Sequence, residues 1–163
     1  MVLNLTGRQC PPTVQTAVGG NRMGTAGMPR SVLAGTRVLL IEDETLVAML
    51  LEETLTDLGC QVVGPVARVD AARRAIEHER FDCVLLDIDL HGHPAYPLAE
   101  LLAARGVPFG FVTGYDASRL ARGFAGRPIL PKPFNVRQLR SVLVDLAEGA
   151  RARPRRRGER RKP

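Results

Sequence analysis

The chain has 163 residues, of which 45% are hydrophobic, and this is enough for one domain with a substantial core. No apolar run approaches the roughly 18 residues needed to cross a bilayer, and the first residues lack the basic start and hydrophobic region of a secretion signal. Three widely spaced cysteines without a CxxC pair argue against both a disulfide framework and a zinc site. We therefore expect a cytoplasmic protein without a membrane segment, whose cysteines are reduced.

The net charge of +6 is concentrated at the two ends of the chain. Residues 1–30 carry three Arg and no acidic group, and residues 149–163 carry eight basic groups and one Glu. The part between them has 12 basic and 16 acidic groups, which gives a net charge of −4. We predict a disordered extension over 1–35 and a basic disordered tail over 149–163, on either side of a mildly acidic domain at 36–148.

Within that domain, short apolar runs alternate with segments of helical periodicity. The run before Asp87 has four uninterrupted apolar residues, which is typical of a strand buried on both faces of a parallel sheet. Strands are predicted at 38–41, 61–66, 82–87, 108–112 and 128–130. Helices are predicted at 44–58, 69–80, 98–105, 116–122 and from 135 to about 146, with a Gly/His/Pro loop at 91–97. Five alternating units predict an α/β fold with a doubly wound, five-stranded parallel sheet.

Acidic, hydroxyl or amino side chains stand at the carboxyl ends of four predicted strands. They are Glu42 and Asp43 after the first strand, Asp87 in the third, Thr113 after the fourth and Lys132 after the fifth. Because ligands bind at this edge of an open α/β sheet, we expect these side chains to converge. Three carboxylates repel one another unless a cation is present, and oxygen ligands suit Mg²⁺. Asp87 could then act as a nucleophile toward phosphorus, while Lys132 and Thr113 bind phosphoryl oxygens.

In this order and spacing, these residues resemble those of response-regulator receiver domains, and the resemblance covers residues 37 to about 146. It implies a flavodoxin-like (βα)5 receiver fold and a two-component phosphorelay. Asp87 would accept a phosphoryl group from a sensor histidine kinase or a histidine phosphotransfer protein, with Mg²⁺ bound by Asp43 and Asp87. Glu42 would assist through water, and the backbone carbonyl of Asp89 would complete the metal ligands. The Lys132-Pro133 bond would be the family's cis peptide.

One position separates this chain from receivers of the chemotaxis type. They have Tyr or Phe three residues before the lysine, as an aromatic switch, and here that position is Ile129. The segments FVTGY, AYP and PKPF are instead similar to those of the single-domain FATGUY receivers of alphaproteobacteria, which lack this aromatic residue. Tyr115 either modulates the attack of water on the phosphoryl group or packs over the helix predicted at 116–122.

The resemblance implies a single-domain response regulator rather than a turnover enzyme. Its output would pass through the face formed by the fourth helix, fifth strand and fifth helix to an unknown downstream protein, or it would act as a phosphate sink. The sequence is compatible with either a monomer or a homodimer.

Two other functions compete with this one. A haloacid-dehalogenase-like phosphatase would explain Asp87-Ile88-Asp89 as its DxD motif, but it requires an acidic pair downstream of the lysine. A nucleic-acid-binding regulator would use the basic tail, which lacks stacking aromatic residues and a helical pattern, so we do not expect a nucleic-acid partner. His91 and His93 could bind a transition metal, although solvated loop histidines are the simpler interpretation.

Overall fold

The computed structural model describes residues 32–114 and 122–153. Its centre is a five-stranded sheet with the order β2-β1-β3-β6-β7, in which all neighbours are parallel. The strands are β1 (Arg37–Ile41), β2 (Gln61–Val66), β3 (Cys83–Asp87), β6 (Phe109–Thr113) and β7 (Ile129–Pro131). Starting from β1, the chain adds β2 on one side and then adds β3, β6 and β7 on the other side. This order confirms the predicted doubly wound sheet and places the switch point between β1 and β3.

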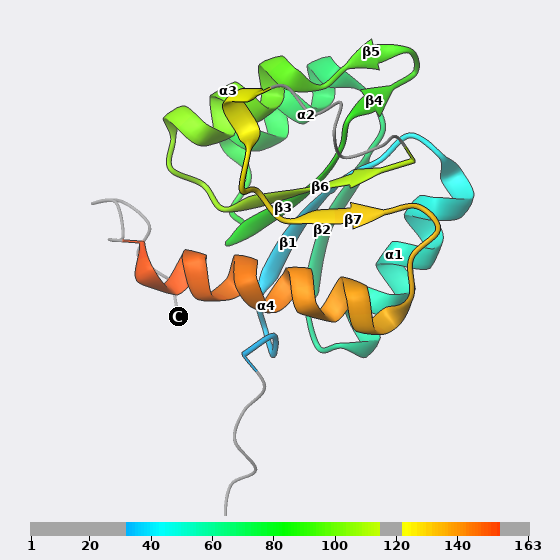
Figure 1. Ribbon diagram of the computed structural model, residues 1–163, viewed down its shortest axis with the longest axis vertical. Coiled ribbons are helices and arrows are strands. Elements are labelled where there is room, and N and C mark those ends of the chain that lie inside the picture. Colours follow the sequence, from blue (N-terminus) through cyan, green and yellow to red (C-terminus); the bar gives the residue numbers. More distant parts are fainter. Residues whose placement is uncertain (1–31, 115–121, 154–163) are drawn as a thin grey trace, which may run out of the picture.

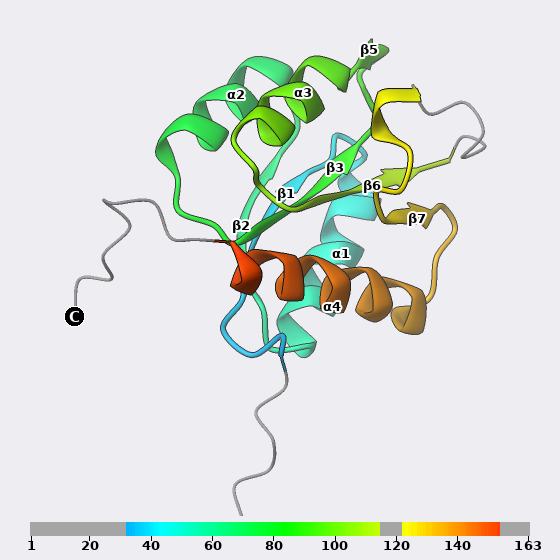
Figure 2. The same cartoon turned by 60° about the vertical axis from the view of Figure 1, so that its left-hand side comes forward.

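Helices cover both faces of the sheet (Figures 1 and 2). α1 (Thr45–Asp57) and α4 (Val136–Ala152) lie on one face, and α2 (Val69–His78) and α3 (Tyr96–Ala104) lie on the other. Successive residues of β1 alternate between the two cores: Val38 and Leu40 pack with the α1/α4 side, and Leu39 and Ile41 pack with the α2/α3 side. The uninterrupted apolar runs are therefore explained by burial on both faces.

The last helix shows how the sequence fixes a local element. The side chain of Asn135 accepts a hydrogen bond from the Gln138 backbone N–H at 3.0 Å, and the Gln138 side chain accepts one from the Asn135 N–H at 2.9 Å. This reciprocal pair satisfies donors that have no partner within the helix. The apolar stripe that follows is buried against the sheet: Leu139, Val142, Leu143, Leu146 and Ala147.

Several element bounds differ from the prediction. The predicted loop at 91–97 contains part of a small antiparallel hairpin, β4 (Asp89–Leu90) and β5 (His93–Pro94), and the first turn of α3. α3 begins at Tyr96 rather than at residue 98, since a proline fits the first turn of a helix. Of the helix predicted at 116–122, only Arg122 is described, and it belongs to a 3₁₀ turn, Arg122–Phe124.

Packed structure also extends beyond the predicted domain limits. Leu33 is fully buried, and α4 continues to Ala152. The guanidinium of Arg151 donates a hydrogen bond to the Val32 carbonyl at 2.9 Å, so the two ends of the described chain are tied together. The prediction of disorder was wrong for residues 32–35 and 149–152, and Arg153 is the C-cap of α4. The remaining residues of both predicted segments lie outside the described residues.

Two of the three cysteines lie within the described residues. Cys60 and Cys83 are free and buried, and burial raises the pKa of the Cys83 thiol to about 12, which keeps it neutral. Cys10 lies outside the described residues.

Among the described helices, none has the length and apolar composition to span a bilayer.

Gly110 provides a test of the packing between α4 and the sheet. A Cβ atom added there would lie 3.2 Å from both the Pro128 carbonyl oxygen and Val142 Cγ1. We expect Gly110→Ala to lower the free energy of unfolding by about 1–3 kcal/mol, as overpacked core positions do, in urea denaturation followed by circular dichroism.

Gly149 is the matched control, because it lies in α4 and its added Cβ would meet Pro108 only at 3.5–3.6 Å, an ordinary contact. Gly149→Ala should stabilise the protein by up to about 1 kcal/mol through helix propensity. Equal effects of the two substitutions would contradict the close approach of α4 to β6.

Candidate functional site

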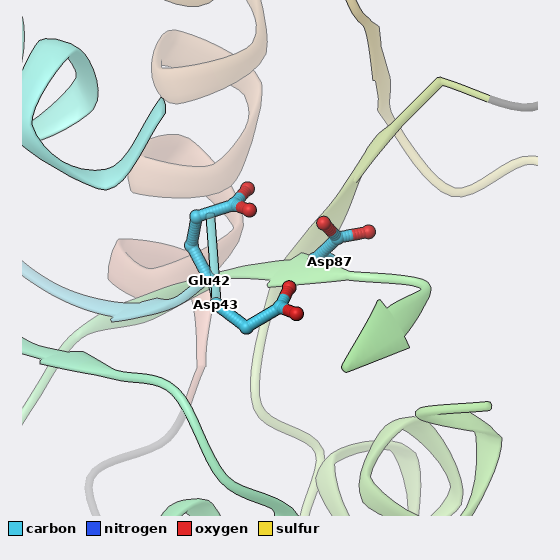
Figure 3. Close-up of side chains that lie close together, drawn as sticks. All are labelled: Glu42, Asp43 and Asp87. Atoms are coloured by element: carbon cyan, nitrogen blue, oxygen red, sulfur yellow. The ribbon is translucent and has the colours of Figure 1, made fainter. Parts of the chain in front are cut away.

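Three carboxylates meet where β1 and β3 end. Glu42 and Asp43 follow β1, Asp87 is the last residue of β3, and these two strands are neighbours in the sheet. One oxygen from each carboxylate lies within 4.8 Å of the others. Figure 3 shows the three side chains pointing into the same space between the strand ends. The predicted convergence of Glu42, Asp43 and Asp87 is therefore present in the structure.

Lys132, just after β7, supplies the positive charge of this cluster. Its Nζ donates a hydrogen bond to Oδ2 of Asp87 at 2.7 Å and lies 2.9 Å from both carboxylate oxygens of Glu42. It also donates to Oε1 of Glu44 at 2.9 Å. One ammonium thus holds three carboxylates, two of them almost fully buried: the Glu42 side chain is 0% exposed and that of Asp87 is 8% exposed.

The protonation of the cluster follows from burial and from these contacts. Burial raises the pKa of Glu42 to about 7, with the charge of Asp87 adding to the effect and the hydrogen bond from Lys132 opposing it. For Lys132, burial alone would lower the pKa, but the hydrogen bonds to Asp87, Glu42 and Glu44 outweigh burial and raise it. The ammonium therefore stays charged at neutral pH, while Glu42 changes protonation in that range.

Backbone hydrogen bonds fix the elements that carry these groups. The Lys132 N–H donates to the Thr113 carbonyl at 2.7 Å, and the Asp89 N–H donates to Oδ1 of Asp87 at 3.1 Å. Thr113 ends β6 and is buried, so its position between β3 and β7 agrees with the prediction. The Lys132-Pro133 peptide bond is cis, as the resemblance implied.

Of Ile129 and Tyr115, only Ile129 lies within the described residues. Ile129 begins β7, is half-buried and pairs with Phe111 of β6, so an aliphatic side chain stands where receivers of the chemotaxis type have their aromatic switch. Tyr115 lies outside the described residues.

Two residues at the site were not predicted as site residues. Glu44, 62% exposed, belongs to the acidic run after β1, and that run was the signal that could have identified it. The sequence pattern favours a solvated loop histidine at His91. It remains more than half exposed, but its Nδ1 lies 3.1 Å from Oδ2 of Asp43. That contact joins residues 48 positions apart, and nothing in the local sequence pattern indicates it.

The donor set of the cluster is compatible with a divalent cation. Asp43 and Asp87 offer carboxylate oxygens from adjacent strands, and the Glu42 carboxylate lies beside them with both of its oxygens 2.9 Å from the Lys132 ammonium. Hard cations such as Mg²⁺ take carboxylate, carbonyl and water oxygens. Among the described residues, this is the group of three acidic side chains with the spacing of a metal site.

Comparison with known proteins relates this arrangement to a family. Residues 38–144 match the family model described as the response regulator receiver domain. Phyllosphere-induced regulator PhyR of Methylorubrum extorquens is 33% identical over 136 residues, which are 78% of this chain and 51% of PhyR. The chain spans about half the length of the curated relatives it matches.

Two solved structures are also similar. SdrG from Sphingomonas melonis Fr1 is 39% identical, with a TM-score of 0.63 over 69% of this chain and 96% of SdrG, and its BeF3-activated conformation has been solved as well. The receiver domain of sensor histidine kinase PA1611 from Pseudomonas aeruginosa PAO1 is 30% identical, with a TM-score of 0.61 over 71% of this chain and 99% of that domain. That structure has a magnesium ion coordinated in its active-site cleft.

The family match favours the receiver interpretation over the haloacid-dehalogenase-like phosphatase. The extent of that match, together with the identity to PhyR, shows that the chain belongs to the response regulator receiver-domain family, whose members signal in two-component systems through phosphorylation.

Proposed function

We propose that this chain accepts a phosphoryl group on Asp87 from the phosphohistidine of a sensor histidine kinase or a histidine phosphotransfer protein. The observation that carries the proposal is the position of the Asp87 carboxylate, at the switch point of the sheet and 2.7 Å from the Lys132 ammonium. A carboxylate oxygen of Asp87 would attack phosphorus, and the bond from phosphorus to the donor imidazole would break. Water would later hydrolyse the acyl phosphate and release inorganic phosphate.

The residues around Asp87 suit distinct tasks in this transfer. The Asp89 N–H and the Lys132 ammonium each bind one oxygen of the Asp87 carboxylate, which fixes the orientation of the nucleophile. After transfer, Lys132 would pair with the new phosphoryl charge, and the Thr113 hydroxyl would donate to a phosphoryl oxygen. Asp87, Thr113 and Lys132 stand at the ends of β3, β6 and β7, which are neighbours in the sheet.

We propose Mg²⁺ as the cofactor, bound by Asp43, Asp87 and the backbone carbonyl of Asp89, with Glu42 assisting through water. The acidic cluster and the magnesium ion in the similar PA1611 receiver domain support this assignment. When bound, the ion would neutralise charge on the phosphoryl oxygens. The chain itself would orient the nucleophile and supply the lysine.

An exposed apolar surface of this chain lies beside the site, and the phosphodonor could dock on it. Leu46, Met49 and Leu50 in the first half of α1 are each more than half exposed, and so is Val136 at the start of α4. Both helices lie on the same face of the sheet (Figure 2). The imidazole of the donor must reach Asp87. A donor helix that carries the histidine could do this from the α1/α4 surface, whereas surfaces farther from the strand ends would leave the imidazole too distant.

We further propose that the chain acts as a cytoplasmic regulator rather than a turnover enzyme. Its signal would pass to a protein partner through β7, α4 and the segment between 116 and 122, or it would serve as a phosphate sink. PhyR from Bartonella quintana, a similar protein, is an anti-anti-sigma factor, and this supports a downstream protein partner.

Intact mass spectrometry after incubation with acetyl phosphate and Mg²⁺ tests the acceptor. We expect the wild type to gain one phosphoryl mass and Asp87→Asn to gain none, since an amide is a poor nucleophile. Phosphate released in the same tube separates rapid hydrolysis from a failure to react.

Asp145→Asn is the control, because Asp145 is exposed on α4 and can be changed without altering the cluster. Phosphorylation of Asp87→Asn at the wild-type level would contradict the proposal, and so would a wild type that neither gains mass nor releases phosphate.

Glu44 competes with the incoming phosphoryl group for Lys132, and its carboxylate repels anionic donors. Exposed ion pairs are worth about 0.2–1 kcal/mol, so Glu44→Gln should raise the rate of phosphorylation by acetyl phosphate by a factor between about 1.4 and 5. The rate is measured by quenched-flow mass spectrometry at low ionic strength.

Glu53→Gln, a charge change farther along α1, should leave this rate within error of the wild type because of screening. A rate for Glu44→Gln equal to or below that of the wild type would show that Glu44 does not restrain Lys132.

A further inference from the structure

The β4–β5 hairpin places an unusual residue at its turn. Leu90 pairs with His93, so His91 and Gly92 form the two-residue connection. Both have positive φ angles, 54° for His91 and 79° for Gly92, which is the pattern of turns that favour Asn-Gly or Gly-Gly. Residues other than glycine are uncommon in this conformation and less favourable than glycine, and histidine is among the few that adopt it more often. A contact made by the imidazole would account for a histidine at this position.

That contact is with Asp43. The backbone N–H of His91 donates to Oδ2 of Asp43 at 2.9 Å, and Nδ1 of the same residue lies 3.1 Å from the same oxygen. The backbone N–H and the imidazole Nδ1 of one residue therefore lie within 3.1 Å of the same carboxylate oxygen. With the ring proton on Nδ1, both groups donate to the two lone pairs of Oδ2, and a cation that binds Asp43 would meet Oδ1.

We propose that His91 is a positioning residue, which holds the Asp43 carboxylate in the orientation that a divalent cation requires. Groups that hydrogen-bond to metal-binding side chains fix their orientation in this way. The proposal rests on the proposed function to the extent that Asp43 binds the cation. It also links the β4–β5 hairpin to occupation of the site, because the turn and the carboxylate are joined by both the backbone and the ring of His91.

The test is the dissociation constant of Mg²⁺ for the full chain, measured without any phosphodonor by amide chemical shifts in ¹⁵N NMR, for which 17.7 kDa is suitable. His91→Gly removes the ring and relieves the positive φ, so the variant should be at least as stable as the wild type. It should bind Mg²⁺ about tenfold more weakly, the lower end of the effect of losing such a group. The amides of His91 and Gly92 should shift on Mg²⁺ addition in the wild type.

His93→Ala is the matched control, since His93 is exposed in the paired strand of the same hairpin. It should bind Mg²⁺ as the wild type does. Unchanged Mg²⁺ affinity in His91→Gly would overturn the positioning role while leaving the proposed function intact. A wild type that binds no divalent cation would instead overturn the proposed metal site, and the role of His91 with it.

Titration with Mn²⁺ separates positioning from direct ligation. Positioning through Asp43 predicts the same loss of affinity for Mg²⁺ and Mn²⁺ in His91→Gly. A loss confined to Mn²⁺, which accepts imidazole more readily, would overturn the proposal and make His91 a ligand.

Discussion

The contact of the Lys132 ammonium with three carboxylates is the interaction on which the site depends. In the sheet, β7 is separated from β3 by β6, so two strand spacings of about 5 Å lie between the lysine's strand and Asp87. The long lysine side chain covers this distance. Glu42 and Asp87 are nearly buried, and buried carboxylates require a partner of opposite charge. The strand order therefore determines which charges can meet.

The sequence was most informative where burial alone decides the structure. The run from Cys83 to Leu86 is apolar at every position, because β3 lies at the centre of the sheet with a helical layer on each side. The order of acidic, threonine and lysine residues at the strand ends then followed from topology. The β4–β5 hairpin could not be predicted, since two-residue strands are too short to show a period.

Contacts between distant parts of the chain mark the limit of the sequence prediction at the site. Asp43 and His91 are 48 positions apart, and Glu44 and Lys132 are 88 apart. A strand end predicts which edge a residue reaches, but not which neighbour its side chain meets there. The acidic run gave Glu44 a place at that edge, whereas its hydrogen bond to Lys132 depends on rotamers that only the folded chain defines.

Protonation and cation binding are two ways to relieve the same repulsion. Burial beside Asp87 raises the pKa of Glu42 to about 7 even though Lys132 donates to it, so a single ammonium does not balance the cluster. A divalent cation would bring the missing positive charge and favour the ionised carboxylates. A phosphoryl group on Asp87 would add negative charge and draw on the same lysine. The cluster therefore has more acidic groups than its one lysine balances, and under the proposed function this excess would couple cation binding to phosphoryl transfer.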